Sequence, residues 1–409
     1  MSNLAELDQR LVAVAKGVRV LGALSFPDQV AVAFVESWKR GDPALPEPPE
    51  VAVLPDAVTD ELRAIERAVD PGDPRGRFLR ETAESYRQVA GLLCCAGTSE
   101  FYDRSAAIYG SANSLLPGAE VSHLEVARRL LDTTEALAAA TPEHEADYCL
   151  SAEHVADQIR ARIDAFFGEA ALRVVIDPSL ASKAAASAVR IRIRGLTCFS
   201  DADIGQLVEH EAFVHSATAL NGRLQPHLKS LSLGAPRTTA TQEGLATFAE
   251  LTTGVMDLAR LRRIALRVHA VHLAEQGADL LDVFHAVLEA GQTPSEAAQT
   301  ALRIFRGAPL GGGAPFTKDV VYLRGLFAVH TFLRRAIIDV RPDLVARLFV
   351  GRLTLSDALA FDELGDLLEP PRYVPPWAAN LRSLATYLSM SAVASVIDLS
   401  ALSLDEVTA

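Results

Sequence analysis

Residues 210–215 have the sequence HEAFVH, in which four residues separate two histidines and a glutamate follows the first histidine. In a regular α-helix, side chains five positions apart lie about 140° apart around the axis, against about 40° for side chains four positions apart. Histidines with this spacing cannot bind one metal ion on an ideal helix. A single π-bulge would absorb the extra residue, so a shared metal predicts a distorted helix between His210 and His215. The alternative is an accidental spacing, because the chain has 10 histidines.

A third metal ligand of a suitable type follows in the segment TQEGLA, where Glu243 lies 28 residues after His215. An acidic side chain is favoured in the first turn of a helix in any case, so this glutamate also has a simpler explanation. Two histidines and one glutamate, with water in the open position, form a common catalytic zinc site. Glu211 could then act as the general base for that water. We therefore predict one Zn²⁺ ion bound by His210, His215 and Glu243, with Glu211 as a catalytic residue.

Helix-terminal residues indicate which elements carry these side chains. Ser200 and Asp203 have capping-box spacing and Asn221-Gly222 is a typical helix end, so a helix is predicted over residues 201–220. A second helix is predicted over residues 241–254. It places Glu250 on the same face as the predicted ligand Glu243, where Glu250 could orient a metal-binding histidine.

Two further helices are predicted downstream. Thr293, Pro294 and Glu296 supply an N-cap, a first-turn proline and an acidic third position, and Gly307 lies past the end of that helix. Thr317 is expected to cap the next helix.

Two segments before residue 200 have strand character. Residues 171–176 form a short β-branched run, and residues 189–194 alternate as VRIRIR, which places three arginines on one face. The second strand could pair with an extended peptide by edge addition. Elsewhere, apolar residues recur at helical spacing in residues 4–14, 28–38, 121–139 and 154–167. We expect an α+β, predominantly α-helical fold, with an N-terminal helical region over residues 1–168 and a catalytic region over residues 169–409.

Composition excludes several classes of protein. The formal net charge of −13 argues against nucleic-acid binding, which needs a basic surface. Residues 1–10 lack the apolar core of a secretory signal. The apolar stretch 383–397 is shorter than the roughly 20 residues of a membrane span and includes serines and a threonine. We expect a cytoplasmic protein that binds neither nucleic acid nor membranes.

The four cysteines, Cys94, Cys95, Cys149 and Cys198, contain no CxxC pair and are too few for a disulfide scaffold. We expect them to be small buried apolar side chains. His144-Glu145 and His154 lack helical metal-ligand spacing, and we expect them on a solvated face.

Three segments together resemble one known family. HEAFVH, QEGLA and FTKDVVYLRGL, at residues 210–215, 242–246 and 316–326, look like the motifs of the family that includes the microtubule-associated tyrosine carboxypeptidases and bacterial proteins named for a QEGLA motif and flavohemoglobin expression. The resemblance covers roughly residues 171–333 and implies a zincin-like metallopeptidase core, with the small sheet before the HExxxH helix.

Carried over to this sequence, the resemblance implies that His210 and His215 are the histidine ligands, Glu211 the catalytic glutamate and Glu243 the glutamate ligand. Other residues fall at spacings similar to those of the family, and they are Asn221, Gln225, Pro226, Lys318, Asp319 and Tyr322. The eukaryotic members remove a C-terminal tyrosine from tubulin, so a terminal aromatic residue is the implied preference and the reaction type is the property that transfers.

Two residues of the third motif are candidates for the substrate site. The Tyr322 hydroxyl could donate to the oxyanion of the tetrahedral intermediate, although a buried tyrosine is more often part of a core. Lys318 lies one helical turn earlier and could bind the α-carboxylate of a peptide, unless it is a solvated surface lysine. Arg192, in the alternating strand, competes for that role.

These assignments predict a zinc carboxypeptidase that hydrolyses the last bond of a peptide or protein with a free C-terminus. Two alternatives stay open. A dipeptidyl-peptidase type of zinc enzyme also uses HExxxH with a downstream glutamate, but its second motif differs from QEGLA. A non-catalytic regulator of flavohemoglobin expression would not need the intact Glu211.

Overall fold

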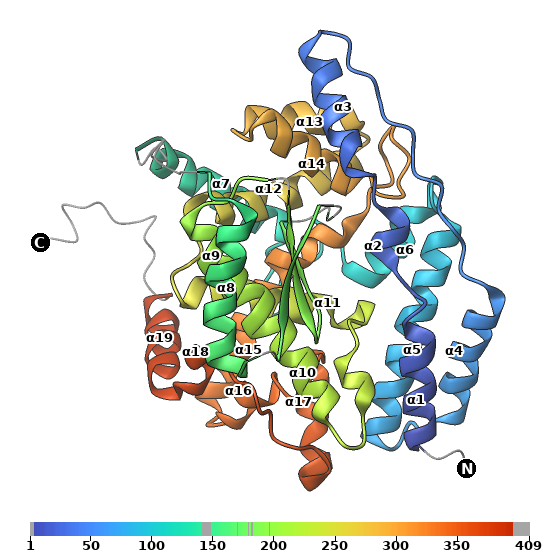
Figure 1. Ribbon diagram of the computed structural model, residues 1–409, viewed down its shortest axis with the longest axis vertical. Coiled ribbons are helices and arrows are strands. Elements are labelled where there is room, and N and C mark those ends of the chain that lie inside the picture. Colours follow the sequence, from blue (N-terminus) through green and yellow to red (C-terminus); the bar gives the residue numbers. More distant parts are fainter. Residues whose placement is uncertain are drawn as a thin grey trace, which may run out of the picture.

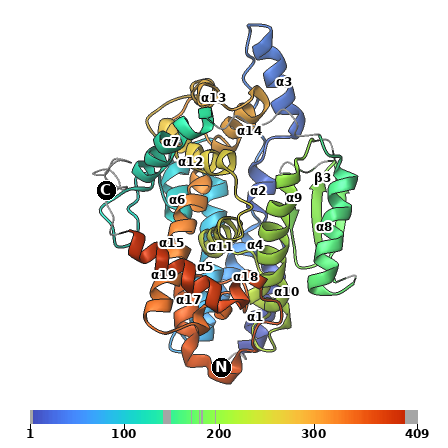
Figure 2. The same ribbon diagram turned by 90° about the vertical axis from the view of Figure 1, so that its left-hand side faces the viewer.

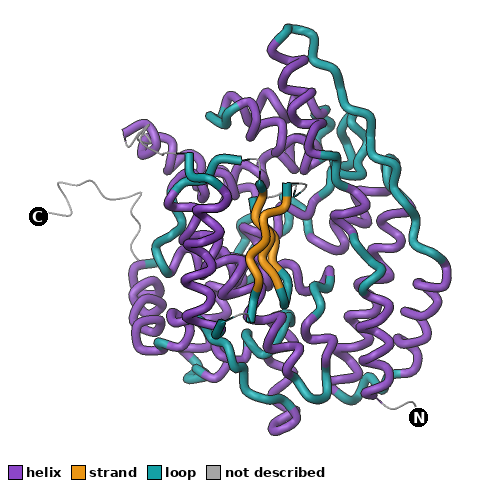
Figure 3. The backbone as a smooth tube through the Cα atoms, viewed as in Figure 1, coloured by secondary structure: helices purple, strands orange, loops and turns teal. Residues whose placement is uncertain are grey.

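The computed structural model describes residues 4–140, 149–169, 171–178, 180, 183–195 and 197–395. Most of them are helical, and a three-stranded sheet lies among the helices (Figure 3). The expected α+β, predominantly helical class is confirmed, whereas the zincin-like core stays a prediction. His144 and Glu145 lie outside the described residues.

Helices from the first 110 residues form one side of the molecule, with α3 projecting at one end (Figure 1). They are α1 (Leu4–Ala15), α2 (Val20–Leu24), α3 (Asp28–Lys39), α4 (Asp56–Ala68), α5 (Pro74–Cys94) and α6 (Glu100–Tyr109). α7 (His123–Ala140) lies across the molecule from them and packs against α12 (Leu258–Glu275). The Asp8 carboxylate on α1 accepts hydrogen bonds from the backbone N–H groups of Lys229 (2.7 Å) and Ser230 (3.0 Å). This buried contact ties the start of the chain to its centre.

The segment Leu4–Lys39 passes a test of length and composition for a membrane-crossing helix. From the sequence, a different apolar stretch, residues 383–397, had been considered as a membrane span and found too short. Leu4–Lys39 is divided into α1, α2 and α3, and Leu7, Leu11 and Phe34 are buried in the core. Core segments of soluble proteins and signal sequences share this length and composition.

The sheet consists of β1 (Arg173–Asp177), β2 (Ala184–Ala186) and β3 (Arg190–Arg194) in the order β1-β3-β2. β3 runs parallel to β1 and antiparallel to β2. Ile191 and Ile193 are fully buried, which confirms the alternation in β3. β2 is missing from the prediction because its three alanines carry no strand propensity. Since β3 has a partner on both edges, the expectation that it binds a peptide by edge addition is wrong.

The helix that follows the sheet is interrupted by an unusual segment. α9 (Asp201–Leu207), a π-helix (Val208–Ser216) and α10 (Ala217–Leu224) follow one another directly. The expected capping box at Ser200 is confirmed. The expected end at Asn221-Gly222 is wrong, because the helix continues to Leu224.

The remaining helices complete the molecule. They are α11 (Thr239–Thr252), α12 (Leu258–Glu275), α13 (Leu280–Glu289), α14 (Pro294–Ile304), α15 (Val321–Ile338), α16 (Asp343–Arg347), α17 (Leu355–Ala360), α18 (Pro376–Ala379) and α19 (Leu381–Ala394). The capping box at Thr293 is confirmed. Thr317 does not cap α15: a 3₁₀ turn, Thr317–Val320, precedes that helix, and the Thr317 hydroxyl lies 2.9 Å from the hydroxyl of Ser105.

Two apolar clusters divide the interior. The larger one draws on α1 to α7 and on α11 to α19, which we call the helical body. The smaller one draws on α8 (Ala152–Phe167), the sheet and α9, which we call the sheet lobe. The lobe lies at one side of the body (Figure 2). The larger cluster joins residues from both sides of position 168, and the division of the chain at that position stays a prediction.

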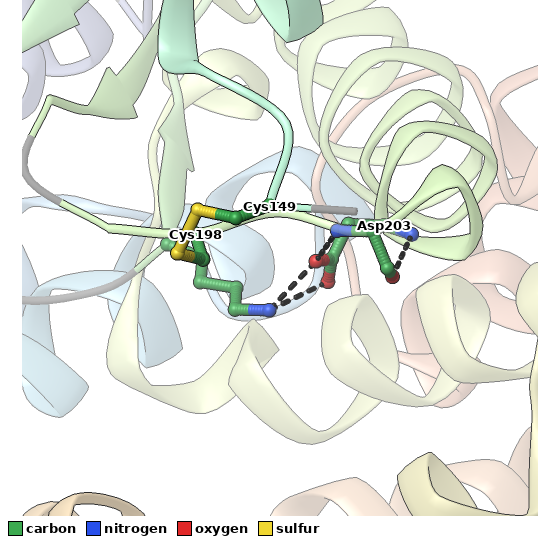
Figure 4. Close-up of a disulfide and its surroundings, with 5 residues drawn as sticks. Cys149, Cys198 and Asp203 are labelled. Atoms are coloured by element: carbon green, nitrogen blue, oxygen red, sulfur yellow. Dashed lines mark hydrogen bonds and ion pairs between the residues drawn. A yellow bond between two sulfur atoms is a disulfide. The ribbon is translucent and has the colours of Figure 1, made fainter. Parts of the chain in front are cut away.

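A disulfide within the sheet lobe corrects the expectation for two of the cysteines. Cys149, just before α8, is bonded to Cys198, just before the N-cap of α9 (Figure 4). Asp203, beside this bond, forms an ion pair with Lys183 at 2.7 Å. Four cysteines are therefore enough for one cross-link, even though they form no scaffold. Cys94 and Cys95 are free. Cys95 is buried as expected, whereas Cys94 is exposed, so the expectation of a buried side chain is wrong for Cys94.

Candidate active site

The π-helix brings the two histidines together. The ring centroids of His210 and His215 lie 4.8 Å apart, and the rings are nearly perpendicular, at 89°. One ligand atom from each of His210, His215 and Glu243 lies within 4.8 Å of the others. The predicted distortion between the histidines is confirmed, because the wider turn of the π-helix returns both rings to one face.

The carbonyl groups of the π-helix receive hydrogen bonds from outside the segment. The Thr218 hydroxyl lies 2.8 Å from the carbonyl oxygen of Val214, and Arg352 donates to the carbonyl of His215 at 3.0 Å. The same hydroxyl lies 2.9 Å from the side-chain oxygen of Gln242. Thr218 therefore links the histidine segment to the residue that precedes Glu243.

Glu243 reaches the histidines because α11 crosses α15 at very short range. A Cβ atom on Gly244 would lie 2.2 Å from the backbone of Gly325, and one on Gly325 would lie 2.1 Å from the carbonyl oxygen of Ala240. Only glycine allows two helix backbones to approach so closely. The glycines in EGLA and YLRGL thus have a physical role, which is to hold Glu243 against the helix that carries Tyr322.

A chain of buried polar groups fixes the orientation of His210. Its Nδ1 lies 2.6 Å from Glu250 Oε1, as the helical spacing had indicated. Arg260 donates two hydrogen bonds to the same carboxylate, at 3.0 and 3.1 Å. Burial opposes ionisation of Glu250, but Arg260 and His210 outweigh burial and lower its pKa to about 2. A charged acceptor on Nδ1 leaves Nε2 facing Glu243, the arrangement typical of a metal-binding histidine.

These side chains fit a divalent metal ion. Glu243 Oε2 lies 3.4 Å from His210 Nε2 and 3.6 Å from His215 Nε2. It is buried and has no hydrogen-bond partner among the described residues. An unpartnered buried carboxylate oxygen between two imidazole nitrogens is an unusual arrangement without a cation. Two imidazoles and one carboxylate form a donor set that suits zinc.

Glu211 borders a cavity of about 380 Å³ that also reaches His210 and Tyr322. Its walls include arginines from α12 and α14, residues of α9, Phe26 and Pro27 before α3, and Lys183 and Ala184 at the start of β2. The cavity thus lies between the sheet lobe and the helical body. It gives a ligand access to Glu211 next to the candidate metal site.

Tyr322 and Lys318 occupy different positions relative to this cavity. The Tyr322 side chain lines it, with the Lys318 ammonium 5.5 Å from the centre of its ring. Lys318 is buried, does not line the cavity, and its ammonium lies 3.4 Å from Glu243 Oε1. Burial opposes ionisation of Glu243, but Lys318 and the two histidines hold its pKa well below the ordinary value. The solvated-surface alternative for Lys318 is therefore excluded.

Arg192 is not brought to the site. Its guanidinium pairs with Asp177 on β1 at 3.3 Å, and the cavity beside His210 is lined instead by Arg194 from the same strand. The expectation for Arg192 failed because the strand pattern fixes a face of the sheet but not the position along it.

Three of the residues that fall at spacings similar to those of the family form hydrogen bonds that hold segments of the chain together. The Asn221 amide donates to the carbonyls of Phe349 (2.7 Å) and Tyr373 (2.8 Å). Gln225 donates to the carbonyl of Glu369 at 2.9 Å. Asp319 accepts two hydrogen bonds from Arg303, both at 2.7 Å.

Sequence reasoning missed the arginines around Tyr322, namely Arg260, Arg267 and Arg303. Their signal was weak, because an arginine on a helix is most often a surface residue. The spacing of Arg260 and Arg267, seven positions apart on α12, was the one available indication that they share a face.

The chain matches a known family over most of its length. The family model described as microtubule-associated tyrosine carboxypeptidase matches residues 33–395 of the 409-residue chain. No curated protein matches the chain. The matched segment includes the π-helix, α11 and α15, and it extends the resemblance into the N-terminal helices. The chain therefore belongs to the microtubule-associated tyrosine carboxypeptidase family, which implies a carboxypeptidase type of enzyme.

Proposed function

We propose that this protein is a zinc-dependent carboxypeptidase with a zincin-like site, which removes the last residue of a peptide or protein that has a free C-terminus. The observation that carries the proposal is the convergence of His210, His215 and Glu243 beside a cavity that Glu211 borders. His210, His215 and Glu243 would hold the ion. Zinc, when bound, would act as a Lewis acid on the scissile carbonyl.

Glu211 is assigned the proton transfers. Its carboxylate takes a proton from the attacking water, the water oxygen bonds to the carbonyl carbon, and the C–N bond breaks as the proton passes to the leaving amine. The products are a shortened chain with a new carboxylate and a free amino acid. Glu211 is placed for both transfers because it adjoins a ligand and borders the cavity.

Tyr322 is assigned to the carbonyl oxygen. Its side chain lines the same cavity, and three cationic groups lie within 6 Å of its ring centre, with the farthest, Arg260, at 5.9 Å. Cationic groups around the phenol favour negative charge that develops on an oxygen beside it. Lys318 is assigned to Glu243, whose carboxylate it orients, and not to the substrate.

The substrate proposed is a peptide C-terminus, and the preference for a terminal tyrosine or phenylalanine rests on the family alone. A terminal aromatic side chain would meet Phe26 and Pro27, apolar residues of the cavity wall. Although the whole chain is acidic, basic residues outnumber acidic ones around this cavity.

The test compares metal content and peptide hydrolysis in the parent, in Glu211→Gln and in Glu209→Gln. Glu209 is a matched control, because it lies on the same π-helix but does not line the cavity. We expect one zinc per chain in all three proteins, and a loss of turnover by a factor of about 10²–10⁴ in Glu211→Gln alone. The peptides are blocked at the N-terminus, at the C-terminus, or at neither end.

Cleavage that needs a free N-terminus would support a dipeptidyl-peptidase type of enzyme instead. Equal behaviour of Glu211→Gln and the parent on every peptide with a free C-terminus would reject the carboxypeptidase proposal. Zinc without any hydrolysis in the parent would favour a regulatory role.

A further inference from the structure

Buried cations gather around Tyr322, and most of them have a carboxylate partner. Arg260 donates two hydrogen bonds to Glu250, and Lys318 lies 3.4 Å from Glu243. Arg303 donates two hydrogen bonds to Asp319. Each of these three carboxylates is thus already engaged by one cation.

Arg267 differs from its neighbours. Its Nε atom is buried and has no hydrogen-bond partner among the described residues, and the nearest carboxylate, Asp319, is 3.8 Å away. Both oxygens of Asp319 already accept from Arg303 at 2.7 Å. Burial and the charge of Arg303 lower the pKa of Arg267 to about 9, so it still carries its charge at neutral pH. A buried guanidinium with an unmet N–H donor is costly and calls for a partner.

The position of Arg267 connects its guanidinium to the reaction site. Arg260, Arg263 and Arg267 lie on one face of α12, and all three line the cavity that reaches His210 and Glu211. The Arg267 guanidinium lies 5.8 Å from the centre of the Tyr322 ring. An anion bound to Arg267 would therefore occupy the same cavity as the groups assigned to the reaction.

We propose that Arg267 binds the α-carboxylate of the residue that is removed. The inference rests on the proposed function, because only an enzyme that acts at the C-terminus requires a carboxylate site so close to the scissile bond. In an extended peptide, the terminal carboxylate carbon lies within about 4 Å of the scissile carbonyl carbon. A guanidinium is the side chain best suited to a carboxylate, because it can bind both oxygens.

The neighbouring cations are less suited to this role. Arg260 and Lys318 would have to leave Glu250 and Glu243, which orient the metal-binding residues. Arg263 lines the cavity but pairs with Glu296 at 3.3 Å, at a partly exposed position. Arg263 is therefore the matched control for Arg267, with the same side chain on the same helix face.

The experiment measures binding and not turnover. In the full-length Glu211→Gln protein, the affinities of two fluorescein-labelled pentapeptides ending in tyrosine are measured by fluorescence anisotropy. The two peptides differ only at the C-terminus, which is a free carboxylate in one and an amide in the other. Arg267→Gln, Arg267→Lys and Arg263→Gln are compared in this background, and circular dichroism and thermal unfolding verify their folding.

We expect the background protein to bind the free acid more tightly than the amide by about 10- to 100-fold. Arg267→Gln should lose that preference by weakening the free acid alone, Arg267→Lys should retain part of it, and Arg263→Gln should retain all of it. Equal binding of acid and amide by the background protein would overturn the inference, as would a folded Arg267→Gln that still selects the acid.

Failure of the inference and failure of the proposed function give different results. If the parent cleaves peptides with free C-termini and Arg267→Gln keeps the acid preference, the inference fails while the function stands. If no peptide is cleaved but the acid preference exists and depends on Arg267, the carboxylate site stands and the function fails.

Discussion

The helical body and the sheet lobe hold the two halves of the site by different means. Glu243 is held by the body, through the backbone contact between Gly244 and Gly325 and through buried charges. The histidines stand on a π-helix that both regions share, because Val214 packs into the larger apolar cluster and Phe213 into the smaller one. The lobe adds a disulfide where the body relies on packing and ion pairs. Substitutions in the helical body should therefore disturb Glu243, and substitutions in the sheet lobe should disturb the histidines.

The largest effect is expected from Glu250→Ala in the body. The substitution leaves the buried Arg260 without its partner and His210 without its acceptor. We expect a loss of about 3–5 kcal/mol in the free energy of unfolding and a 10- to 100-fold weaker affinity for zinc. Denaturant titration and competition with a zinc chelator measure the two quantities. Glu36→Ala is the control, because its pair with Lys39 is exposed and should be worth less than about 1 kcal/mol.

The second effect belongs to the lobe. Replacing Cys149 and Cys198 by serine should cost about 2–4 kcal/mol, because the bond closes a loop with a sequence separation of 49. Hydrogen exchange should rise in α8 and β3 and stay constant in α11 and α15. Cys94→Ser, at an exposed free cysteine, should change neither. A uniform rise across both regions would contradict the separation of lobe and body.

The cystine also bears on where the protein resides. Disulfides persist in oxidising compartments and are uncommon in the cytoplasm. The cytoplasmic location expected from the sequence stays a prediction, and thiol titration of protein isolated under non-reducing conditions addresses it.

Gly244→Ala should have the third effect, again in the body. The added methyl group meets the backbone of Gly325, so α11 and α15 must separate. We expect a loss of about 1–3 kcal/mol in stability together with reduced zinc content, because Glu243 moves with its helix. Gly311→Ala meets no atom within 4 Å and should keep full zinc content. An unchanged zinc content in Gly244→Ala would show that the crossing does not set the position of Glu243.

The smallest effect concerns the hydroxyl that joins the two halves. Thr218→Val removes the contacts with Val214 and Gln242. It should lower the free energy of unfolding by about 1 kcal/mol, which thermal unfolding measures. Thr386→Val is its control, because among the described residues that hydroxyl bonds only to the carbonyl four residues earlier, at an exposed position of α19. A larger cost at Thr386 than at Thr218 would rule out a structural role for the link.

Local patterns in the sequence were sufficient to predict the fold class and the candidate metal ligands, but they were not sufficient to predict the substrate site. The HExxxH spacing predicted the π-helix because helical geometry leaves few other ways to unite His210 and His215. The spacing of Glu250 likewise indicated its contact with His210. Each of these inferences depends on positions along one or two helices.

Features that depend on long-range packing were not predictable in this way. Arg192 and Arg194 look alike in the sequence, and only the packing of the sheet against the body decides which one lines the cavity. The pairing of Cys149 with Cys198 depends on how the chain returns across the lobe. Arg267 differs from the arginines around it because their carboxylate partners are already engaged. The spacing of residues along the sequence does not show which arginine is paired with which carboxylate.

The π-helix also preserves the rotational phase of the helix that follows it. One additional residue on a regular α-helix would turn the rest of that helix by about 100°, but the wider turn absorbs it. Asn221, on α10, therefore keeps the orientation in which it contacts Phe349 and Tyr373, despite the longer spacing of the histidines. A regular helix with the same number of residues would turn both His215 and Asn221 away from their partners. The same distortion thus serves the metal ligands and the docking of the C-terminal segments.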